Sequence, residues 1–166
     1  MAWTSPTSFN DPNSKWSSEE QSYDGQVETA ASSFINKKST WSYFIELEID
    51  EIICKTIRFH ALSSADITQI DVDLYYQGDW HDLYEGAFDD ATWVEKSMVN
   101  HQYVTKARVR FYASAAATAY LYEFEFNEIV SGLINGYFMQ DGTREEKFGY
   151  FMNAVEAFGY YMNPLI

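Results

Sequence analysis

Carboxylate side chains gather in the middle of the sequence, where they could bind a divalent cation. The segment 71–95 is rich in Asp and Glu and contains neither Lys nor Arg. Ca²⁺ takes about six to eight oxygen ligands from carboxylates and carbonyls, often on a loop. The candidate ligands are Asp79, Asp82, Asp89 and Asp90. Their spacing lacks the order of an EF-hand, and solvated turn acids are the alternative interpretation.

A second group of residues has the chemical types that a sugar site uses, namely aromatic rings for stacking and polar side chains for hydroxyl groups. These candidates for ligand binding are Tyr75, Trp80, His81, Arg108 and Arg110. In the alternative, Tyr75 and Trp80 are core or interface residues, and the two arginines pair with facing Glu123 and Glu125 on adjacent strands.

The sequence offers no arrangement that favours catalysis. We find no nucleophile with a nearby base, no Gly-rich phosphate loop and no metalloprotease motif. The histidines, His60, His81 and His101, are far apart and lack metal-ligand spacing. We therefore expect a binding or structural protein without catalytic residues, enzymatic activity or a cofactor, apart from the candidate Ca²⁺.

Charge and cysteine usage limit the partners and the compartment. Eleven Lys and Arg face 25 Asp and Glu, which gives a net charge of −14 and disfavours a nucleic-acid partner. The single Cys54 excludes an intramolecular disulfide, and we expect a buried, inert thiol. Because no signal peptide or membrane-spanning stretch is recognisable, we expect synthesis in a cytoplasm and no membrane partner.

The elements that must position these residues are β-strands, because apolar and polar residues alternate over several segments. The turn Gln77-Gly78-Asp79 predicts a hairpin in which Gly78 has a positive φ. The alternation predicts several inward rows. They are Trp41, Tyr43, Ile45, Leu47 and Ile49; Ile57 and Phe59; Ile70, Val72, Leu74 and Tyr76; Ala107, Val109 and Phe111; and Tyr120, Tyr122, Phe124 and Phe126. The predicted strands are 41–49, 53–61, 70–76, 80–84, a segment near Trp93, 103–113 and 119–128, which together indicate an all-β sandwich or barrel.

The two ends of the chain differ from this pattern. Residues 1–20 are polar with scattered aromatics and predict an N-terminal arm. Residues 130–166 predict an interaction tail, partly helical from the capping-box residues Thr143 and Glu146 onward. In the alternative, the tail covers one sheet. The candidate partner-binding residues are Phe138, Met139, Phe148, Phe151, Met152, Phe158, Tyr161 and Met162.

Several short motifs resemble the discoidin, or galactose-binding-like, family. They are the turn Tyr23-Asp24-Gly25 followed by Thr29, Trp41 entering the strand Ile45-Glu46-Leu47, and the later segments 107–111 and 121–124. The resemblance implies an antiparallel jelly-roll β-sandwich over residues 21–129, between the arm and the tail. It also implies glycan binding as known for family members, and related sandwiches bind structural Ca²⁺ at loops.

Two functions of different classes follow from these features. The leading hypothesis is a non-enzymatic structural subunit of a virion, such as a capsid decoration, collar or tail accessory protein of a tailed bacteriophage. It would dock on other structural subunits, as a homo-oligomer or a hetero-assembly, through its arm and aromatic tail. The alternative is a carbohydrate-binding module used for glycan or host-surface attachment, and a third possibility is an accessory domain of a larger cytoplasmic complex.

Overall fold

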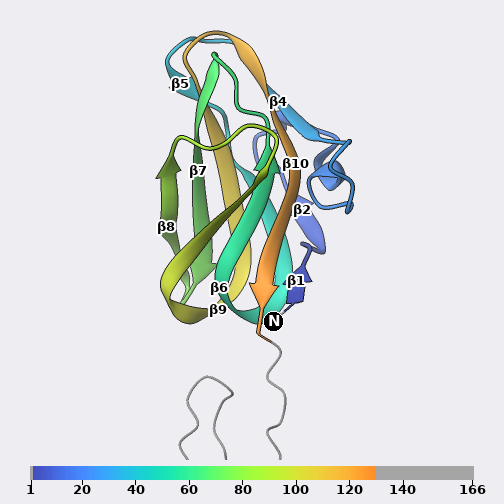
Figure 1. The fold of residues 1–166 in the computed structure, drawn as a ribbon, viewed down its shortest axis with the longest axis vertical. Coiled ribbons are helices and arrows are strands. Elements are labelled where there is room, and N and C mark those ends of the chain that lie inside the picture. Colours follow the sequence, from blue (N-terminus) through green and yellow to red (C-terminus); the bar gives the residue numbers. More distant parts are fainter. Residues whose placement is uncertain (1, 130–166) are drawn as a thin grey trace, which may run out of the picture. The chain divides into compact units, whose positions relative to one another are not determined.

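The computed structural model describes residues 2–129 as one all-β, antiparallel unit (Figure 1). The single helical element in this part of the chain is a 3-10 turn, η1 (Glu19–Ser22). In chain order the strands are β1 (Ala2–Thr4), β2 (Ser8–Asn10), β3 (Trp16–Ser17), β4 (Ala31–Ile35), β5 (Thr40–Trp41), β6 (Ile45–Ala61), β7 (Ile67–Tyr76), β8 (Asp79–Gly86), β9 (Trp93–Ala113) and β10 (Ala117–Glu128). They form a ten-stranded sheet with the path β3-β4-β10-β6-β9-β7-β8, to which β1, β2 and β5 attach.

The two longest strands, β6 and β9, fold this sheet into a sandwich because each takes part in both layers. The first half of β6 pairs with the second half of β9, as Ile45 with Val109, and the second half of β6 pairs with the first half of β9, as His60 with Trp93. Register shifts within β6 mark the bend between the layers. Layer A contains β2, β5, β7 and β8, and layer B contains β1, β3, β4 and β10. The sequence predicted separate strands over 41–49 and 53–61, but a bulged bend joins residues 45–61 into one strand.

The core lies between the layers and confirms most of the predicted inward rows. Its largest fully buried side chains include Phe59, Phe111, Phe124 and Phe126. The predicted inward residues that the structure buries are Ile45, Leu47, Ile49, Ile57, Phe59, Ile70, Val72, Leu74, Ala107, Val109, Phe111, Phe124 and Phe126. Cys54 is also fully buried, as predicted, and burial raises the pKa of its thiol to about 11.

Two predicted inward rows contain errors, and both occur where the strand is irregular. Tyr43 is 54% exposed, and Ser42 is buried in its place because Ser42 exchanges hydrogen bonds with the backbone of Phe111 just before β6 begins. In β10 a register shift between Leu121 and Glu123 changes the phase of the alternation. Leu121 is therefore buried, whereas Tyr120 and Tyr122, which were predicted to face inward, are not.

Residues 76–79 form the predicted hairpin turn. Gln77 and Gly78 both have positive φ, at 54° and 85°, and this geometry matches the twist of two paired strands. The turn places Trp80 opposite Tyr75 on the neighbouring strand. It therefore fixes the position of two candidate ligand-binding residues.

The segment that the sequence predicts as an N-terminal arm contributes β1, β2, β3 and η1 to the sheet. Phe9 pairs with Leu47, and Trp3 pairs with Asn127. Trp16 is 5% exposed, packs against Phe111 and donates a hydrogen bond from Nε1 to the carbonyl of Tyr43. Residues 2–17 are thus integrated in the sandwich.

The predicted interaction tail and its helix fall outside the described residues, and so do all the candidate partner-binding residues from Phe138 to Met162. Within residues 2–129 there is no helix of the length and hydropathy needed to span a membrane.

Candidate functional site

Arginine and aromatic side chains form a continuous row on the outer side of layer A. We call this surface the arginine–aromatic face and define it by Trp41, Phe44, Asp71, Asp73, Tyr75, Trp80, Asp82, Arg108 and Arg110. The strand register brings them together, since Arg108 lies opposite Asp73 and Arg110 opposite Asp71 on β7. Because side chains alternate along a strand, residues 71, 73 and 75 share this outer side.

Each arginine of the face is held by a buried carboxylate. Arg108 Nε donates to Asp73 Oδ2 at 2.6 Å, and Arg110 Nε donates to Asp71 Oδ2 at 2.7 Å. The side chains of Asp73 and Asp71 are only 9% and 6% exposed. Burial, with the negative charge of Asp73, raises the pKa of Asp71, while the bond from Arg110 opposes this rise.

In the alternative interpretation of the sequence, Arg108 and Arg110 pair with Glu123 and Glu125. This pairing is wrong. Both glutamates lie on β10, which neighbours β4 and β6 in the sheet path and is not adjacent to β9. Glu125 instead forms an ion pair with Arg58 of β6. The sequence analysis identified the acidic and basic strands but not which strands are neighbours.

Aromatic rings pack against both guanidinium groups. Arg108 lies over Phe44 at 4.3 Å and over Trp80 at 4.6 Å from the ring centroids, and Arg110 lies over Phe44 at 4.4 Å and over Trp41 at 4.9 Å. Such contacts contribute about 0.5–1 kcal/mol each at exposed sites. The row therefore alternates rings and cations in a fixed order, and its side chains are preorganised.

Four of the five predicted ligand-binding residues meet on this face, and one does not. Tyr75 packs edge-on against Trp80 at 5.2 Å, next to the two arginines. His81 points to the opposite side of β8, where it stacks on Tyr76 at 3.9 Å. Sequence reasoning predicted Trp41 to face inward, which is wrong, because Trp41 lies against Arg110 on the outer side. It missed Phe44, Asp71 and Asp73 as site residues, although the alternation in β7 already placed both Asp residues beside Tyr75.

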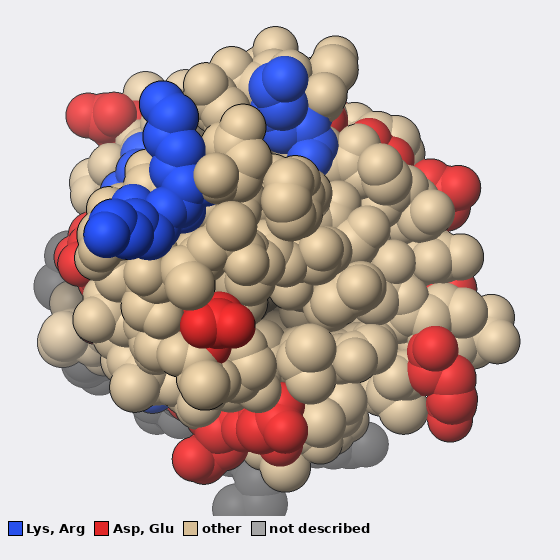
Figure 2. All heavy atoms as spheres, turned by 90° about the horizontal axis from the view of Figure 1, so that it is seen from above, with Lys and Arg blue, Asp and Glu red and all other residues tan. Residues whose placement is uncertain are grey.

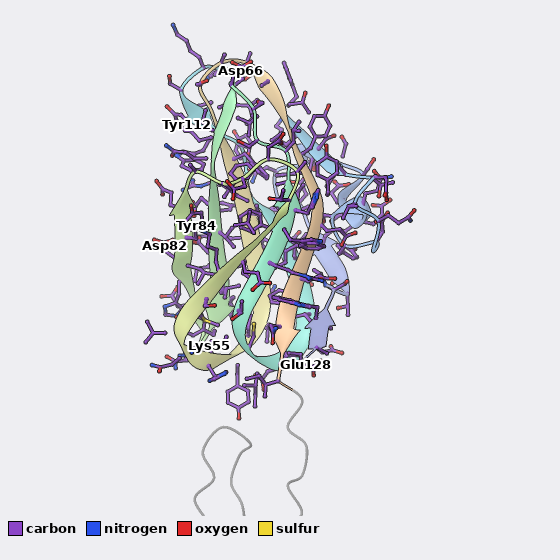
Figure 3. All side chains as sticks on the ribbon, viewed as in Figure 1. Lys55, Asp66, Asp82, Tyr84, Tyr112 and Glu128 are labelled. Carbon is purple, nitrogen blue, oxygen red and sulfur yellow. The ribbon has the colours of Figure 1, made fainter. Side chains whose placement is uncertain are left out.

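The face retains hydrogen-bonding groups that a ligand could use. Each arginine binds its aspartate through Nε, and within residues 2–129 no further hydrogen bond occupies its terminal amino groups. Asp82 is exposed on the β8 side of the molecule (Figure 3), and a carboxylate oxygen of Asp82 lies within 4.8 Å of those of Asp71 and Asp73. The hydroxyl groups of a sugar can accept hydrogen bonds from the terminal amino groups of the arginines and donate hydrogen bonds to the Asp82 carboxylate.

The predicted Ca²⁺ ligands do not gather in the structure. Asp79 caps the amide of Trp80, and Asp90 accepts from the amide of Ser63. The one acidic group found in the described residues joins Asp82 to Asp71 and Asp73, whose charges the arginines already balance. Seen from above, most of the surface is uncharged, and acidic and basic side chains are scattered over it (Figure 2).

A different turn has the chemistry of a structural cation site. Glu123 is 1% exposed, its Oε1 accepts from the amide of Gln26, and its Oε2 has no hydrogen-bond partner. Asp24 lies beside it and accepts a bond from the hydroxyl of Thr29. Burial first, then the neighbouring carboxyl group of Asp24, raises the pKa of Glu123 to about 7, while the hydrogen bonds from the turn amides oppose the rise.

The carboxylates of Glu123 and Asp24 and the Thr29 hydroxyl bonded to Asp24 form an oxygen-rich donor set, which suits a hard cation such as Ca²⁺. Asp24, Thr29 and Glu123 would hold the ion, and its charge would tie the turn to β10. These are the Asp-Gly turn and Thr that carry the resemblance noted in the sequence, joined by a glutamate from the last strand.

Neither a family model nor a curated protein matches this sequence, whereas solved structures do share its fold. A carbohydrate-binding module of family 32, from a family 31 glycoside hydrolase of Clostridium perfringens, matches with a TM-score of 0.60 and 8% identity over 75% of this chain and 96% of that one. The family 32 module of AlyQ, solved with 4,5-unsaturated mannuronic acid, matches with a TM-score of 0.60 and 11% identity over 76% of this chain and 98% of that one. A family 32 module from Clostridium perfringens, solved with galactose, matches with a TM-score of 0.55 and 11% identity over 68% of this chain and 88% of that one.

At these identities the likeness establishes the fold. The described part of the chain is an antiparallel jelly-roll β-sandwich, as the sequence predicted, and it shares this fold with the family 32 modules. The solved structures that share this fold include carbohydrate-binding modules whose nearly whole length aligns with this chain.

Proposed function

We propose that this protein is a non-enzymatic carbohydrate-binding module and that the arginine–aromatic face contacts the sugar. The observation that carries the proposal is that Trp80, Arg108 and Asp82 share one face of a fold that carbohydrate-binding modules also have. The similar modules were solved with galactose, an unsaturated mannuronic acid and other saccharides, which supports a saccharide as the ligand class.

The geometry supports a division of labour between the residues. Trp80 and Tyr75 offer ring surface and edge for the apolar C–H groups of a pyranose, and aromatic side chains supply large contact area at low entropy cost. The terminal amino groups of Arg108 donate to ring hydroxyls, and Asp82 accepts from them. Because Asp73 and two rings already fix Arg108, binding loses little side-chain entropy at this residue.

The charge of the face favours an uncharged saccharide. The aspartates outnumber the arginines, and Asp82 has no cationic partner among residues 2–129. A carboxylate on the ligand would therefore meet like charge here. We expect neutral hexoses or N-acetylhexosamines to bind this face better than uronic acids.

The virion hypothesis receives no support from the comparisons, which favour the carbohydrate-binding alternative. The features that motivated it lie mostly in residues 130–166, outside the described part of the chain, and the first residues belong to the sandwich. Glycan attachment remains compatible with display on a larger assembly.

A glycan array followed by isothermal titration tests the proposal. We expect a neutral saccharide to bind, and Trp80→Ala to weaken the binding at least about tenfold, or ~1.4 kcal/mol. Arg108→Lys keeps the charge but loses the planar fork of donors, so it should also weaken binding. Phe34→Ala is the matched control, because Phe34 is a 67% exposed aromatic on β4 of layer B. Absence of binding to any glycan, or equal binding by Trp80→Ala and Phe34→Ala, would overturn the proposal.

A further inference from the structure

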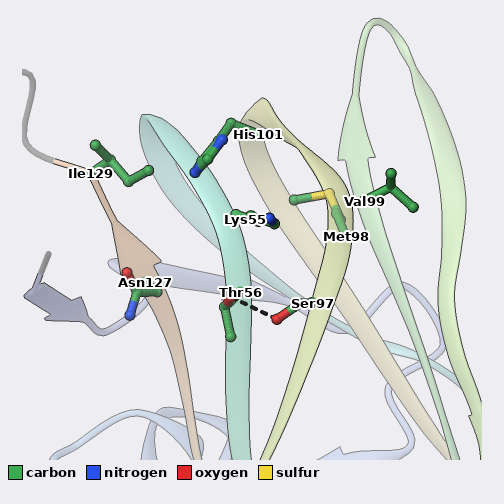
Figure 4. Close-up of a pocket in the computed structure, with 8 residues that line it drawn as sticks. All are labelled: Lys55, Thr56, Ser97, Met98, Val99, His101, Asn127 and Ile129. Carbon is green, nitrogen blue, oxygen red and sulfur yellow. Dashed lines mark hydrogen bonds between the residues drawn. The ribbon is translucent and has the colours of Figure 1, made fainter. Parts of the chain in front are cut away.

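A hollow with a different chemistry lies on layer B, between β6, the first half of β9 and the end of β10 (Figure 4). Its volume of about 510 Å³ falls within the range of small-ligand sites. We call it the Lys55–His101 hollow after the two nitrogen bases in its lining. None of the candidate residues from the sequence lies in it.

Polar groups of the hollow are suited to hydroxyl recognition. Thr56 and Ser97 face each other across paired strands, and their hydroxyls hydrogen-bond at 2.8 Å. Only one of the two hydrogens is used in that bond, so the pair can still donate one and accept others. The amide of Asn127 adds a donor and an acceptor from β10.

An apolar wall adjoins these groups. Val99 is 89% exposed, and Met98 and Ile129 also line the hollow. A saccharide ring has both hydroxyl groups and apolar C–H faces, so a mixed lining of this kind matches it better than it matches a small inorganic ion.

The charge of the hollow is opposite to that of the protein as a whole. The chain carries 25 acidic and 11 basic side chains, yet no Asp or Glu lines the hollow. Lys55 forms no ion pair with any carboxylate of residues 2–129, whereas Lys106, Arg108 and Arg110 are all paired. An ammonium group without a carboxylate partner, in a lining that also contains hydroxyl and imidazole groups, is suited to a charge-assisted hydrogen bond with a carboxylate.

We propose that the Lys55–His101 hollow is a second binding site, which takes a carboxylate-bearing saccharide unit such as a uronic acid. The saccharide class rests on the proposed function, whereas the preference for an anion rests on the hollow alone. Lys55 pairs with the carboxylate, the Thr56–Ser97 hydroxyl pair and Asn127 bind ring hydroxyls, and Val99 contacts the ring face.

Titration of the full chain with trigalacturonic acid and with its fully methyl-esterified form tests this inference. The two probes have the same rings and differ in charge. At the hollow, followed by the imidazole signals of His101, we expect the free acid to bind at least about tenfold more tightly than the ester, with an affinity that falls as salt is added. Lys55→Gln should remove this preference, and Lys37→Gln, which removes a lysine in the exposed turn 36–39, should leave it intact.

NMR mapping makes the failure of this inference distinguishable from failure of the proposed function. The acid should shift the imidazole signals of His101 and leave the indole signal of Trp80 in place, and a neutral saccharide should do the reverse. If a neutral saccharide shifts the Trp80 signal but the acid does not shift the His101 signals, the second site is overturned and the proposed function is not. A His101 shift that persists unchanged in Lys55→Gln would overturn the role of Lys55.

Discussion

The two layers of this sandwich bury carboxylates in different ways. On layer A, Asp71 and Asp73 are each bonded to an arginine of the next strand, and aromatic rings pack against both arginines. On layer B, Glu123 is more deeply buried but has no cationic partner in the described residues, and one of its oxygens is orphaned. The first arrangement balances its own charge. The second is completed only by a proton or by a cation from solution.

Because of this difference, we expect the arginine–aromatic face to be rigid without a ligand and the turn over Glu123 to depend on one. The arginine–aromatic face keeps its shape without a ligand, which suits a surface that binds sugars by preorganised contacts. We expect the turn over Glu123 to be stabilised further by a cation bound to its carboxylates. Variants on the two layers should therefore differ in stability and in their response to Ca²⁺.

The largest expected effect is the loss of a guanidinium on layer A. Arg108→Ala should lower the free energy of unfolding by about 3 kcal/mol, because it leaves Asp73 buried without its cation and removes two cation–π contacts. Urea denaturation measures this change. Asp73→Asn in the same background should recover part of the loss, and a double variant as unstable as the sum of its parts would show that the pair does not interact.

Ca²⁺ should have the next largest effect, and on layer B. Adding Ca²⁺ to chelator-treated protein should raise the free energy of unfolding by about 2.7 kcal/mol at a concentration of about 100 Kd, since only the folded turn brings Asp24 and Glu123 together. Thermal denaturation with and without chelator measures this. Glu123→Gln should abolish the gain and Asp79→Asn should not. A gain that depends on Asp79 would return the cation to the loop predicted from the sequence.

The smallest expected effect concerns a lysine that has no partner in the described residues. Lys55→Gln should change the free energy of unfolding by less than about 0.5 kcal/mol, because Lys55 makes no ion pair with a carboxylate of residues 2–129. Urea denaturation beside Arg108→Ala gives the comparison directly. A loss close to that of Arg108→Ala would mean that Lys55 is a structural cation like the arginines of layer A.

The sequence predicted much of the fold because alternation reports burial locally. Rows such as Ile70, Val72 and Leu74 were predicted as they occur. Errors arose where a bulge or a break shifted the phase, at Tyr122 and at Tyr43, because such irregularities depend on the partner strand.

The sequence predicted which residue types form the candidate site, but it did not predict which residues lie next to one another there. Tyr75, Trp80, Arg108 and Arg110 were identified, yet their acidic partners were assigned to β10 when they lie on β7. Which strands are adjacent is a property of the tertiary fold, and the local pattern of a strand does not contain it. The same limit explains why Glu123 was not associated with Asp24, 99 positions away in the sequence.

The most direct test of the central claim follows the indole signals of the five tryptophans while a neutral saccharide is added. Trp80 lies on the arginine–aromatic face, whereas Trp16 is buried and hydrogen-bonded inside the sandwich. If the face binds sugar, the Trp80 signal moves in a saturable way, the Trp16 signal does not, and Arg108→Lys weakens the response. Saturable binding that leaves Trp80 unmoved would contradict the account.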